Sequence, residues 1–211
     1  MRVLIIGSGG REHALAKALL KSSQPVVLFA IGRNAGMQEL CTMVDLSLSD
    51  HASIVGYALS QHIELAVVGP DEPLVKGLAD AFRLHGIPCF GPSKEAAAIE
   101  GSKAFSKAFM QRHQIPTPAY RVFSEYDRIL AYLADCPLPV VIKADGLALG
   151  KGVVIAFDRE TACEAAKHMM VDNQFGSSGK TVVVEEYASG PEVSLLVFSD
   201  GSTAKAMVSA M

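Results

Sequence analysis

Short apolar runs alternate with helical patterns and glycine-rich turns in the first half of the chain. Continuous apolar runs at residues 3–6, 26–30 and 65–68 predict buried parallel strands. Apolar positions three or four residues apart predict helices over residues 14–21 and 54–61. This alternation of strands and helices is typical of a doubly wound α/β domain built on a parallel sheet.

The same alternation continues as far as a proline-rich segment. The pattern predicts a helix over residues 74–84, a short strand over residues 87–90, and one or two helices over residues 93–113. The two prolines in residues 114–118 then indicate a linker. We therefore predict a first domain that spans residues 1–115.

The last helical stretch before this linker is interrupted at Gly101. Ser102 is a good N-cap for a second helix, because its hydroxyl can accept a hydrogen bond from the first turn. Lys103, in that first turn, opposes the helix macrodipole. An anionic ligand at this helix end would remove the conflict.

The pattern of predicted helices and strands changes in residues 116–211. An amphipathic helix is predicted over residues 124–134, and Asp158 is placed to cap a second helix over residues 159–171. Short β-branched runs predict strands, at residues 139–142, 153–157, 181–184, 192–198 and 204–211. This mixture predicts an α+β region after the α/β domain.

A glycine-rich loop separates two of these strands. It runs from Lys143 to Gly152 with the sequence KADGLALGKG. Its glycines expose backbone N–H groups, and lysine ammonium groups suit phosphate. The loop is either a flap over the phosphates of a nucleotide or an ordinary hairpin turn with solvated lysines. It is not a Walker A loop, because only three residues separate Gly146 from Gly150 and a strand follows.

A second glycine-rich turn, GSGGREH at residues 7–13, follows the first predicted strand. A strand–turn–helix unit presents backbone N–H groups and a helix N-terminus to an anion. The dinucleotide fingerprint requires glycine where Glu12 stands, and residues 31–34, after the second strand, lack the acid that holds a ribose hydroxyl. The turn is therefore either a site for a single phosphate, with Arg11 nearby, or a structural turn.

Two acidic residues follow the predicted strand 65–68. Ligands of open α/β sheets bind at the carboxyl ends of the strands, so Asp71 or Glu72 can hold sugar hydroxyls or an amine. The same residues can instead cap the next helix, where acidic side chains suit the helix dipole. Both interpretations can be true together.

The amino-acid composition bears on the size of the core, the partners and the compartment of the protein. Of the 211 residues, 50% are hydrophobic, which is enough for one large or two small cores. A net charge of −3 gives no indication of nucleic acid or an anionic membrane as partner. The four cysteines are far apart and without a CxxC pair, which predicts reduced thiols in a cytoplasmic protein. No apolar segment is long enough for a membrane span, and the first residues are too short for a signal peptide.

Six short motifs occur in one order along the chain, at residues 7–13, 69–75, 90–93, 101–103, 143–153 and 184–186. With these motifs the chain resembles the phosphoribosylamine–glycine ligase family, the ATP-grasp ligases of purine biosynthesis. The resemblance implies that residues 116–211 are an ATP-grasp region. Its small subdomain would span about 120–185 and its large subdomain would start at 186–211.

The resemblance also implies a reaction in two steps. ATP phosphorylates the carboxylate of glycine, giving an acyl phosphate and ADP. The amine of 5-phosphoribosylamine then attacks the acyl phosphate, forming glycinamide ribonucleotide and phosphate. The implied partners are these small molecules, the implied cofactors are ATP and Mg²⁺ or Mn²⁺, and the full-length family member is expected to be a monomer.

Binding residues carry over by position from the resemblance. Lys103 and Lys143 match lysines that contact the ATP phosphates, and Glu185 matches part of the adenine-binding hinge. The implied ATP-binding residues are Lys103, Lys143, Asp145, Gly146, Gly150, Lys151, Gly152, Glu185, Ala188 and Glu192. The stretch from Asp145 to Gly152 matches a mobile flap, and Glu192 matches the acid that takes the ribose hydroxyls. The implied cradle for the phosphate and ribose of phosphoribosylamine is Gly9, Gly10, Arg11, Glu12 and Glu72.

The family continues for about as many residues again beyond the matching part. That further half holds the Mg²⁺ ligands, the glycine site and a C-terminal lid, so the resemblance assigns no metal ligand to this chain. We expect the chain to be the first half of such an enzyme. We also expect it to be inactive alone, because phosphoryl transfer needs the phosphate charge to be neutralised.

Two other functions remain open from the sequence. One is a different ATP-grasp ligase or carboxylase acting on a purine precursor, against which the GGREH turn argues. The other is a non-catalytic nucleotide-binding fragment, or a regulatory half that needs a partner chain. ATP binding without turnover would favour the second.

The turn at residues 7–13 should bind a monophosphate and not a dinucleotide. The reason is Glu12 in place of the third fingerprint glycine, together with the missing acid after the second strand. Fluorescence titration with NADH should show no saturable binding. Saturation in the micromolar range would contradict this interpretation of the turn.

Overall fold

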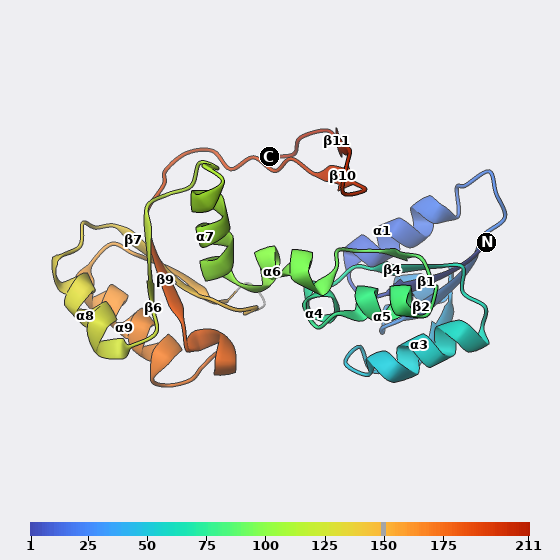
Figure 1. Cartoon of the computed structure of the whole chain (residues 1–211), viewed down its shortest axis with the longest axis horizontal. Helices are drawn as coiled ribbons and strands as arrows, with labels where there is room; N and C mark the ends of the chain where they lie inside the picture. Colours follow the sequence, from blue (N-terminus) through green and yellow to red (C-terminus); the bar gives the residue numbers. More distant parts are fainter. Residues whose placement is uncertain (149–150) are drawn as a thin grey trace.

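The first part of the chain is a parallel sheet with helices on both of its faces (Figure 1). The structure is a computed structural model that describes residues 1–148 and 151–211. Within the described ranges the strand order of this sheet is β3-β2-β1-β4-β5, with every pair parallel. The strands are β1 (Arg2–Ile6), β2 (Val27–Ile31), β3 (Thr42–Val44), β4 (Leu65–Val68) and β5 (Cys89–Phe90). The predicted doubly wound domain is confirmed.

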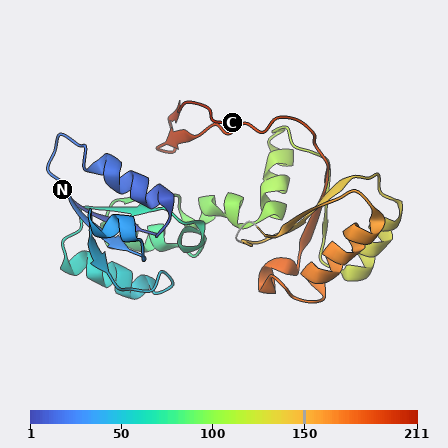
Figure 2. The same ribbon diagram turned by 180° about the vertical axis from the view of Figure 1, so that it is seen from behind.

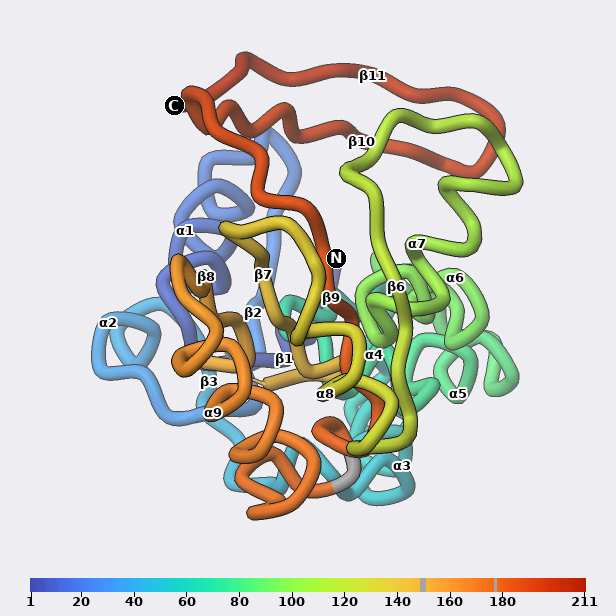
Figure 3. The backbone as a smooth tube through the Cα atoms, turned by 90° about the vertical axis from the view of Figure 1, so that its left-hand side faces the viewer, coloured from blue at the N-terminus to red at the C-terminus, as the bar shows by residue number. Residues whose placement is uncertain are grey.

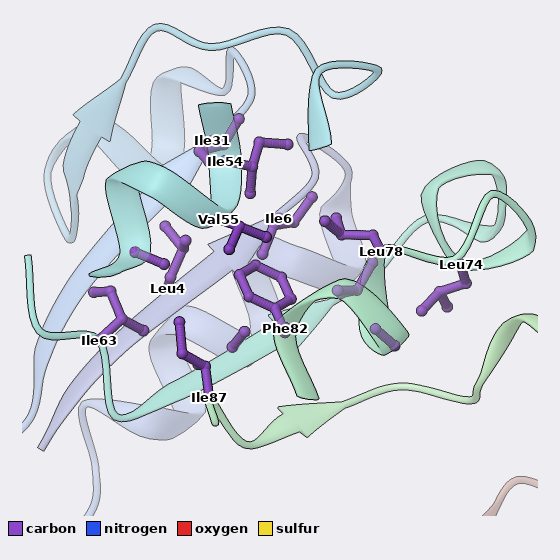
Figure 4. Close-up of a cluster of buried hydrophobic side chains, with 14 of the residues drawn as sticks. Leu4, Ile6, Ile31, Ile54, Val55, Ile63, Leu74, Leu78, Phe82 and Ile87 are labelled. Atoms are coloured by element: carbon purple, nitrogen blue, oxygen red, sulfur yellow. The ribbon is translucent and has the colours of Figure 1, made fainter. Parts of the chain in front are cut away.

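Alternate residues of the central strand face two separate cores, which explains the continuous apolar runs. Leu4 and Ile6 point into the core covered by α3 (His51–Ser60) and α5 (Leu78–Leu84), where Phe82 is fully buried (Figure 4). On the opposite face, a second core includes Val3, Ile5, Ala16 and Met37. Ala16 belongs to α1 (Gly10–Leu19) and Met37 to α2 (Ala35–Gln38).

The helix predicted over residues 74–84 is two helices, so that prediction was wrong. α4 (Asp71–Val75) ends before Gly77, which has φ of 91° and precedes α5. A left-handed backbone of this kind favours glycine and breaks the helical hydrogen-bond pattern.

Within residues 1–148 and 151–211, no helix is both long and apolar enough to cross a membrane.

The predicted interruption before the linker is confirmed. α6 (Lys94–Gly101) and α7 (Lys103–Arg112) meet at Ser102, which has an extended backbone. The Ser102 hydroxyl accepts a hydrogen bond from the N–H of Phe105 at 3.0 Å, as an N-cap does. This junction lies where the chain passes from the first sheet towards the second (Figure 1).

The second part of the chain is an antiparallel sheet with two helices on one face (Figure 1). Its strand order, in the part of the chain that the structure describes, is β6-β9-β7-β8. The strands are β6 (Tyr120–Phe123), β7 (Val140–Ala144), β8 (Val153–Ala156) and β9 (Val182–Glu186). The helices α8 (Tyr126–Asp135) and α9 (Arg159–Met170) pack on one face, and Asp158 caps α9 as predicted. Residues 176–179 form a short 3₁₀ helix. The predicted α+β region is confirmed.

The helix α7 covers part of the other face of this sheet, because it packs against β9. Seen along the long axis, α7 lies beside β6 and β9 (Figure 3). The face that α7 covers carries Lys143 from β7 and Glu185 from β9, since these residues alternate with the core residues Ile142 and Val184.

The last residues form a hairpin of β10 (Val197–Ser199) and β11 (Ala204–Ala206), reached by an extended segment (Figure 2). Every residue of both strands is exposed. The Phe198 ring lies 6.1 Å, centroid to centroid, from the ring of Phe90 on β5. The hairpin therefore returns towards the first sheet.

The linker around residue 115 has neither helix nor strand between α7 and β6. Gln114 has a positive φ of 55°, and Ile115 and Pro116 are exposed. A domain boundary near residue 115 stays a prediction, as do the boundaries of the two subdomains. Because α7 packs against the second sheet, the junction at Ser102 is the alternative position.

Limited proteolysis should distinguish these two positions. Subtilisin cleaves exposed, irregular backbone with little sequence preference, so we expect early cleavage within residues 114–118 or within the loop that joins β7 to β8. The fragments are identified by mass spectrometry. Early cleavage confined to residues 60–90, within the first sheet, would contradict a boundary at the linker, and cleavage near Ser102 would move it to the start of α7.

Candidate functional site

A cleft of about 1190 Å³ lies between the two parts of the chain. Its walls come from the carboxyl ends of the parallel strands, from the α6–α7 junction, and from the loop after β7. It contains six of the residues assigned by resemblance, which are Arg11, Glu72, Lys103, Asp145, Gly146 and Gly152. Residues far apart in the sequence, from both predicted substrate groups, therefore share one cavity.

The carboxylate of Asp145 binds the start of α7. It accepts hydrogen bonds from the Ser102 hydroxyl, at 3.0 and 3.1 Å, and from the Ala104 N–H, at 2.6 Å. In addition, the Lys103 N–H donates to the Asp145 carbonyl at 3.1 Å. Asp145 therefore stabilises a first turn in which Lys103 opposes the dipole. The anionic ligand expected at this helix end stays a prediction.

Lys103 is partly withdrawn from solvent inside the cleft. Its ammonium donates to the Gly146 carbonyl at 3.1 Å. Burial lowers the pKa of Lys103 below its ordinary value, and the nearby ammonium of Lys143 lowers it further, whereas Asp145 and Glu185 raise it. An anionic ligand beside this ammonium would oppose the effect of burial and raise the pKa.

The described part of the glycine-rich loop is held on two sides. Opposite Lys103, the Ser178 hydroxyl donates to the Leu147 carbonyl at 3.1 Å. A side chain on Gly146 would overlap Ser178, so this close approach requires glycine. Lys151 is exposed, and its N–H donates to the Ala148 carbonyl at 2.9 Å. The predicted ligand residue Gly150 lies outside the described residues.

Glu12 is buried at the point where the sheet order reverses, and it is 5% exposed. Its carboxylate accepts a hydrogen bond from the Gly9 N–H at 2.5 Å. Its side chain also packs against Gly7 and Gly69, the turns after β1 and β4, where a methyl group on Gly69 would overlap the carboxylate. Glu12 thus joins two turns, and its predicted contact with a substrate stays a prediction.

The other residues of the predicted cradle are exposed around this buried glutamate. Gly9, Gly10 and Arg11 form the start of α1, and Arg11 lines the cleft. Glu72, also in the cleft, pairs with Lys76 at 2.6 Å across one helical turn. The N-cap position of α4 is Pro70, so neither Asp71 nor Glu72 caps it, but both lie in its first turn.

Lys143 and Glu185 meet outside the cleft lining, on the face of the sheet under α7. The Lys143 ammonium donates to Glu185 Oε2 at 2.9 Å, and the ammonium of Lys107 on α7 forms an ion pair with the same oxygen at 3.0 Å. The side chain of Glu185 is 6% exposed and that of Lys107 is 7% exposed. Lys107 lies in none of the six sequence motifs.

Ala188 and Glu192 follow β9 in an exposed segment and do not line the cleft. In the ranges that the structure describes, no group of three or more His, Cys, Asp or Glu side chains is arranged to hold a metal ion. The cleft is lined by both charges: Arg11, Lys76 and Lys103 supply cationic groups, which suit phosphate oxygens, and Asp71, Glu72, Glu100 and Asp145 supply carboxylates.

Two family models together match the whole chain. Residues 1–100 match the family model for the N domain of phosphoribosylglycinamide synthetase, and residues 101–211 match the model for its ATP-grasp (A) domain. The chain belongs to the phosphoribosylglycinamide synthetase family. The resemblance inferred from the six motifs is therefore confirmed.

Individual members of the phosphoribosylglycinamide synthetase family agree with this assignment. The chain is 48% identical over 203 residues to phosphoribosylamine–glycine ligase of Vibrio parahaemolyticus, covering 95% of this chain and 47% of that protein. It is 46% identical to the enzyme of the same name from Pasteurella multocida, covering 98% of this chain and 49% of that protein. The crystal structure of the Thermotoga maritima phosphoribosylamine–glycine ligase superposes with a TM-score of 0.81 at 29% identity, covering 99% of this chain and 49% of that one. The chain thus spans about half the length of the curated relatives it matches.

The free energy of unfolding should depend on pH because Lys103 is partly buried. Because its pKa in the folded chain lies below the ordinary 10.5, the unfolded chain binds the proton more tightly. The stability of the wild type should therefore rise relative to Lys103→Met as the pH increases from 7 towards 10.5. Urea unfolding of both proteins at pH 7 and pH 10 measures the difference.

The matched control is Lys17→Met, since Lys17 is an exposed lysine on α1, and its two measurements supply the baseline. A difference between wild type and Lys103→Met that falls with increasing pH, relative to this baseline, would show that Lys103 is not desolvated.

Proposed function

We propose that this chain is the part of an ATP-dependent ligase that binds ATP and 5-phosphoribosylamine, in an enzyme that joins glycine to the amine and forms glycinamide ribonucleotide. The observation that carries the proposal is the shared cleft, in which Arg11 and Glu72 of the first sheet line the same cavity as Lys103 and Gly146. An amine donor and a phosphate donor must meet in one cavity for such a reaction.

The chemistry of this reaction gives the cations of the cleft a purpose. A carboxylate is a poor electrophile, because its negative charge repels an attacking amine. Transfer of a phosphoryl group from ATP converts one carboxylate oxygen into a leaving group, and the amine then displaces phosphate as the amide bond forms. The site has to hold several anions together and exclude water from the acyl phosphate.

In this proposal the ATP phosphates bind between Lys103, Lys143 and the backbone of the glycine-rich loop. Lys103 is placed by the start of α7 and Lys143 by β7, and the two ammonium groups are close enough to influence each other. The adenine would bind along the backbone near Glu185 and Ala188, which leaves the Glu185 carboxylate with its lysines. Glu192 would take the ribose hydroxyls.

The phosphate of 5-phosphoribosylamine binds in this proposal at the turn after β1. Gly9 and Gly10 lie at the N-terminus of α1, a ten-residue helix whose dipole favours an anion. The Gly9 N–H donates to Glu12, so the Gly10 amide would be the donor to the phosphate. Arg11 adds a guanidinium beside them. Glu12 holds the turn from inside, and Glu72 lies towards the ribose.

Magnesium and the cellular compartment belong to the same proposal. A divalent cation would neutralise the ATP phosphates during transfer, and its ligands would come from the further half that the relatives have.

The four thiols are free, and burial raises the pKa of Cys89 to about 11, which keeps it unreactive. We propose a cytoplasmic protein on this basis.

Two measurements test the proposal. Calorimetric titration with ATP should show binding, and an assay of glycinamide ribonucleotide formation should show turnover only when the further half is supplied. Binding without turnover in both conditions would favour the second candidate, a nucleotide-binding fragment. The absence of ATP binding would overturn the proposed function.

Lys143 should contribute more to ATP binding than Lys151. Lys143 is fixed on a strand, whereas Lys151 is exposed in the loop, and ordering backbone costs roughly 1–2 kcal/mol per residue. A charge-assisted contact is worth roughly 1.5–3 kcal/mol. Lys143→Ala should therefore weaken binding by about tenfold or more, and Lys151→Ala by about threefold.

Calorimetric titration of ATP into both variants measures this difference, after circular dichroism has shown that each is folded. A greater loss of affinity in Lys151→Ala than in Lys143→Ala would mean that the loop is already ordered before ATP binds.

A further inference from the structure

Three charged side chains from three elements meet on one oxygen atom beneath α7. Glu185 Oε2 on β9 lies 3.0 Å from the Lys107 ammonium and 2.9 Å from the Lys143 ammonium on β7. Glu185 and Lys107 are almost fully buried, whereas the side chain of Lys143 is 26% exposed. One carboxylate therefore faces two cations, and the cluster of three carries a net positive charge.

The two lysines differ in how their donors are used. An ammonium group has three N–H donors. Lys107 has three polar contacts: its ammonium donates to the Thr117 hydroxyl at 2.6 Å and to the Pro118 carbonyl at 3.5 Å, and it pairs with Glu185 at 3.0 Å. Among the residues that the structure describes, Lys143 has one partner, Glu185. The Lys107 ammonium is therefore fixed by three partners, whereas two N–H donors of the Lys143 ammonium are left for another ligand.

We propose that Lys107 is a positioning residue of the nucleotide site, which acts as the permanent counter-ion of Glu185 and so leaves Lys143 free to bind a phosphate group. A buried carboxylate needs a cation close by. If Lys143 were the only cation available, turning it towards a ligand would leave Glu185 buried and unpaired. With Lys107 in place, Lys143 can turn without that cost. This inference rests on the proposed function, since the phosphate is that of ATP.

Substitution of Lys107 tests the proposal by forcing Lys143 to become the only partner of Glu185. Lys107→Met keeps an unbranched apolar stem and removes the charge. ATP binding measured by calorimetry should weaken by about tenfold, the value of one charge-assisted contact. Thr117→Val is the matched control, because it removes an acceptor of Lys107 and leaves the three charges in place. Its affinity should stay within about twofold of the wild type.

The double variant Lys107→Met/Glu185→Gln separates positioning from a structural role. It removes the carboxylate that would capture Lys143, and it keeps the backbone of β9 where the adenine is proposed to bind. Affinity should return to within about threefold of the wild type. If the double variant bound ATP no better than Lys107→Met, the loss would come from damaged packing, and the proposal would be overturned.

A measurement without nucleotide keeps this inference separate from the proposed function. Acetic anhydride reacts only with the neutral amine, so a lysine held by a carboxylate of its own should be acetylated more slowly. Mass spectrometry should show acetylation of Lys143 slowed by about fivefold or more in Lys107→Met and restored in the double variant. Unchanged acetylation in Lys107→Met would overturn the proposal even if the wild type binds ATP. If the wild type does not bind ATP, the proposed function fails, and acetylation alone decides the role of Lys107.

Lys107→Gln serves as the second variant if Lys107→Met does not fold. Glutamine lacks the charge and still carries N–H donors for Thr117 and Glu185. It should slow the acetylation of Lys143 as the methionine variant does. Acetylation at the wild-type rate in a folded Lys107→Gln protein would also overturn the proposal.

Discussion

The hydrogen bonds between the Asp145 carboxylate and the start of α7 join two segments that line the cleft. The chain passes from the first sheet to the second at this helix start, and Asp145 belongs to the loop that faces both. A capping contact is worth about 1 kcal/mol, and an anion at a helix N-terminus adds roughly 0.3–1 kcal/mol. Those contributions favour a first turn that Lys103 alone would disfavour. The loop and the helix are thereby held together, and the cations on either side keep a fixed spacing.

The balance of charge around this contact explains its suitability for a nucleotide. Lys103, Lys107 and Lys143 face two carboxylates, Asp145 and Glu185, and each carboxylate has at least one partner within 3.1 Å. Glu100, which also lines the cleft, is a further carboxylate acting on Lys103. Lys103 and Lys143 are the two lysines with more access to solvent. Partly desolvated cations interact strongly with an anion, because little water competes for them. In the proposed function, a polyphosphate would be that anion.

Most of the secondary structure could be predicted from the sequence because the apolar periodicity matches real burial. The run at residues 3–6 faces two cores, and Ser102 caps α7 as its side chain suggested. β3 and β6 were missed, since they are short and contribute mainly half-buried or exposed residues. Gly77 was also overlooked, because a helical pattern of apolar residues continues through it while its backbone is left-handed.

The candidate site was predictable only where a motif carried it. Lys103 and the glycine-rich loop stand out in the sequence, but Lys107 resembles a solvated lysine one turn further along the same helix. Its burial depends on a carboxylate 78 positions away and on the linker residue Thr117. Glu12 gave a weak local signal, since a glutamate three residues after a helix N-cap often binds back to it. That it also packs against the turn after β4 depends on the strand order alone.

The exposed hairpin of β10 and β11 has a consequence for how these 211 residues behave in concentrated solution. A two-stranded ribbon is marginally stable by itself in water, and its open edges present unpaired backbone groups to other molecules. Val197 and Phe198 are about half exposed, and Val208 beyond them is 90% exposed. A net charge of −3 offers little mutual repulsion. Colloidal stability, and not the cooperativity of the two folded cores, should therefore limit how far the chain can be concentrated, and added salt should lower that limit further.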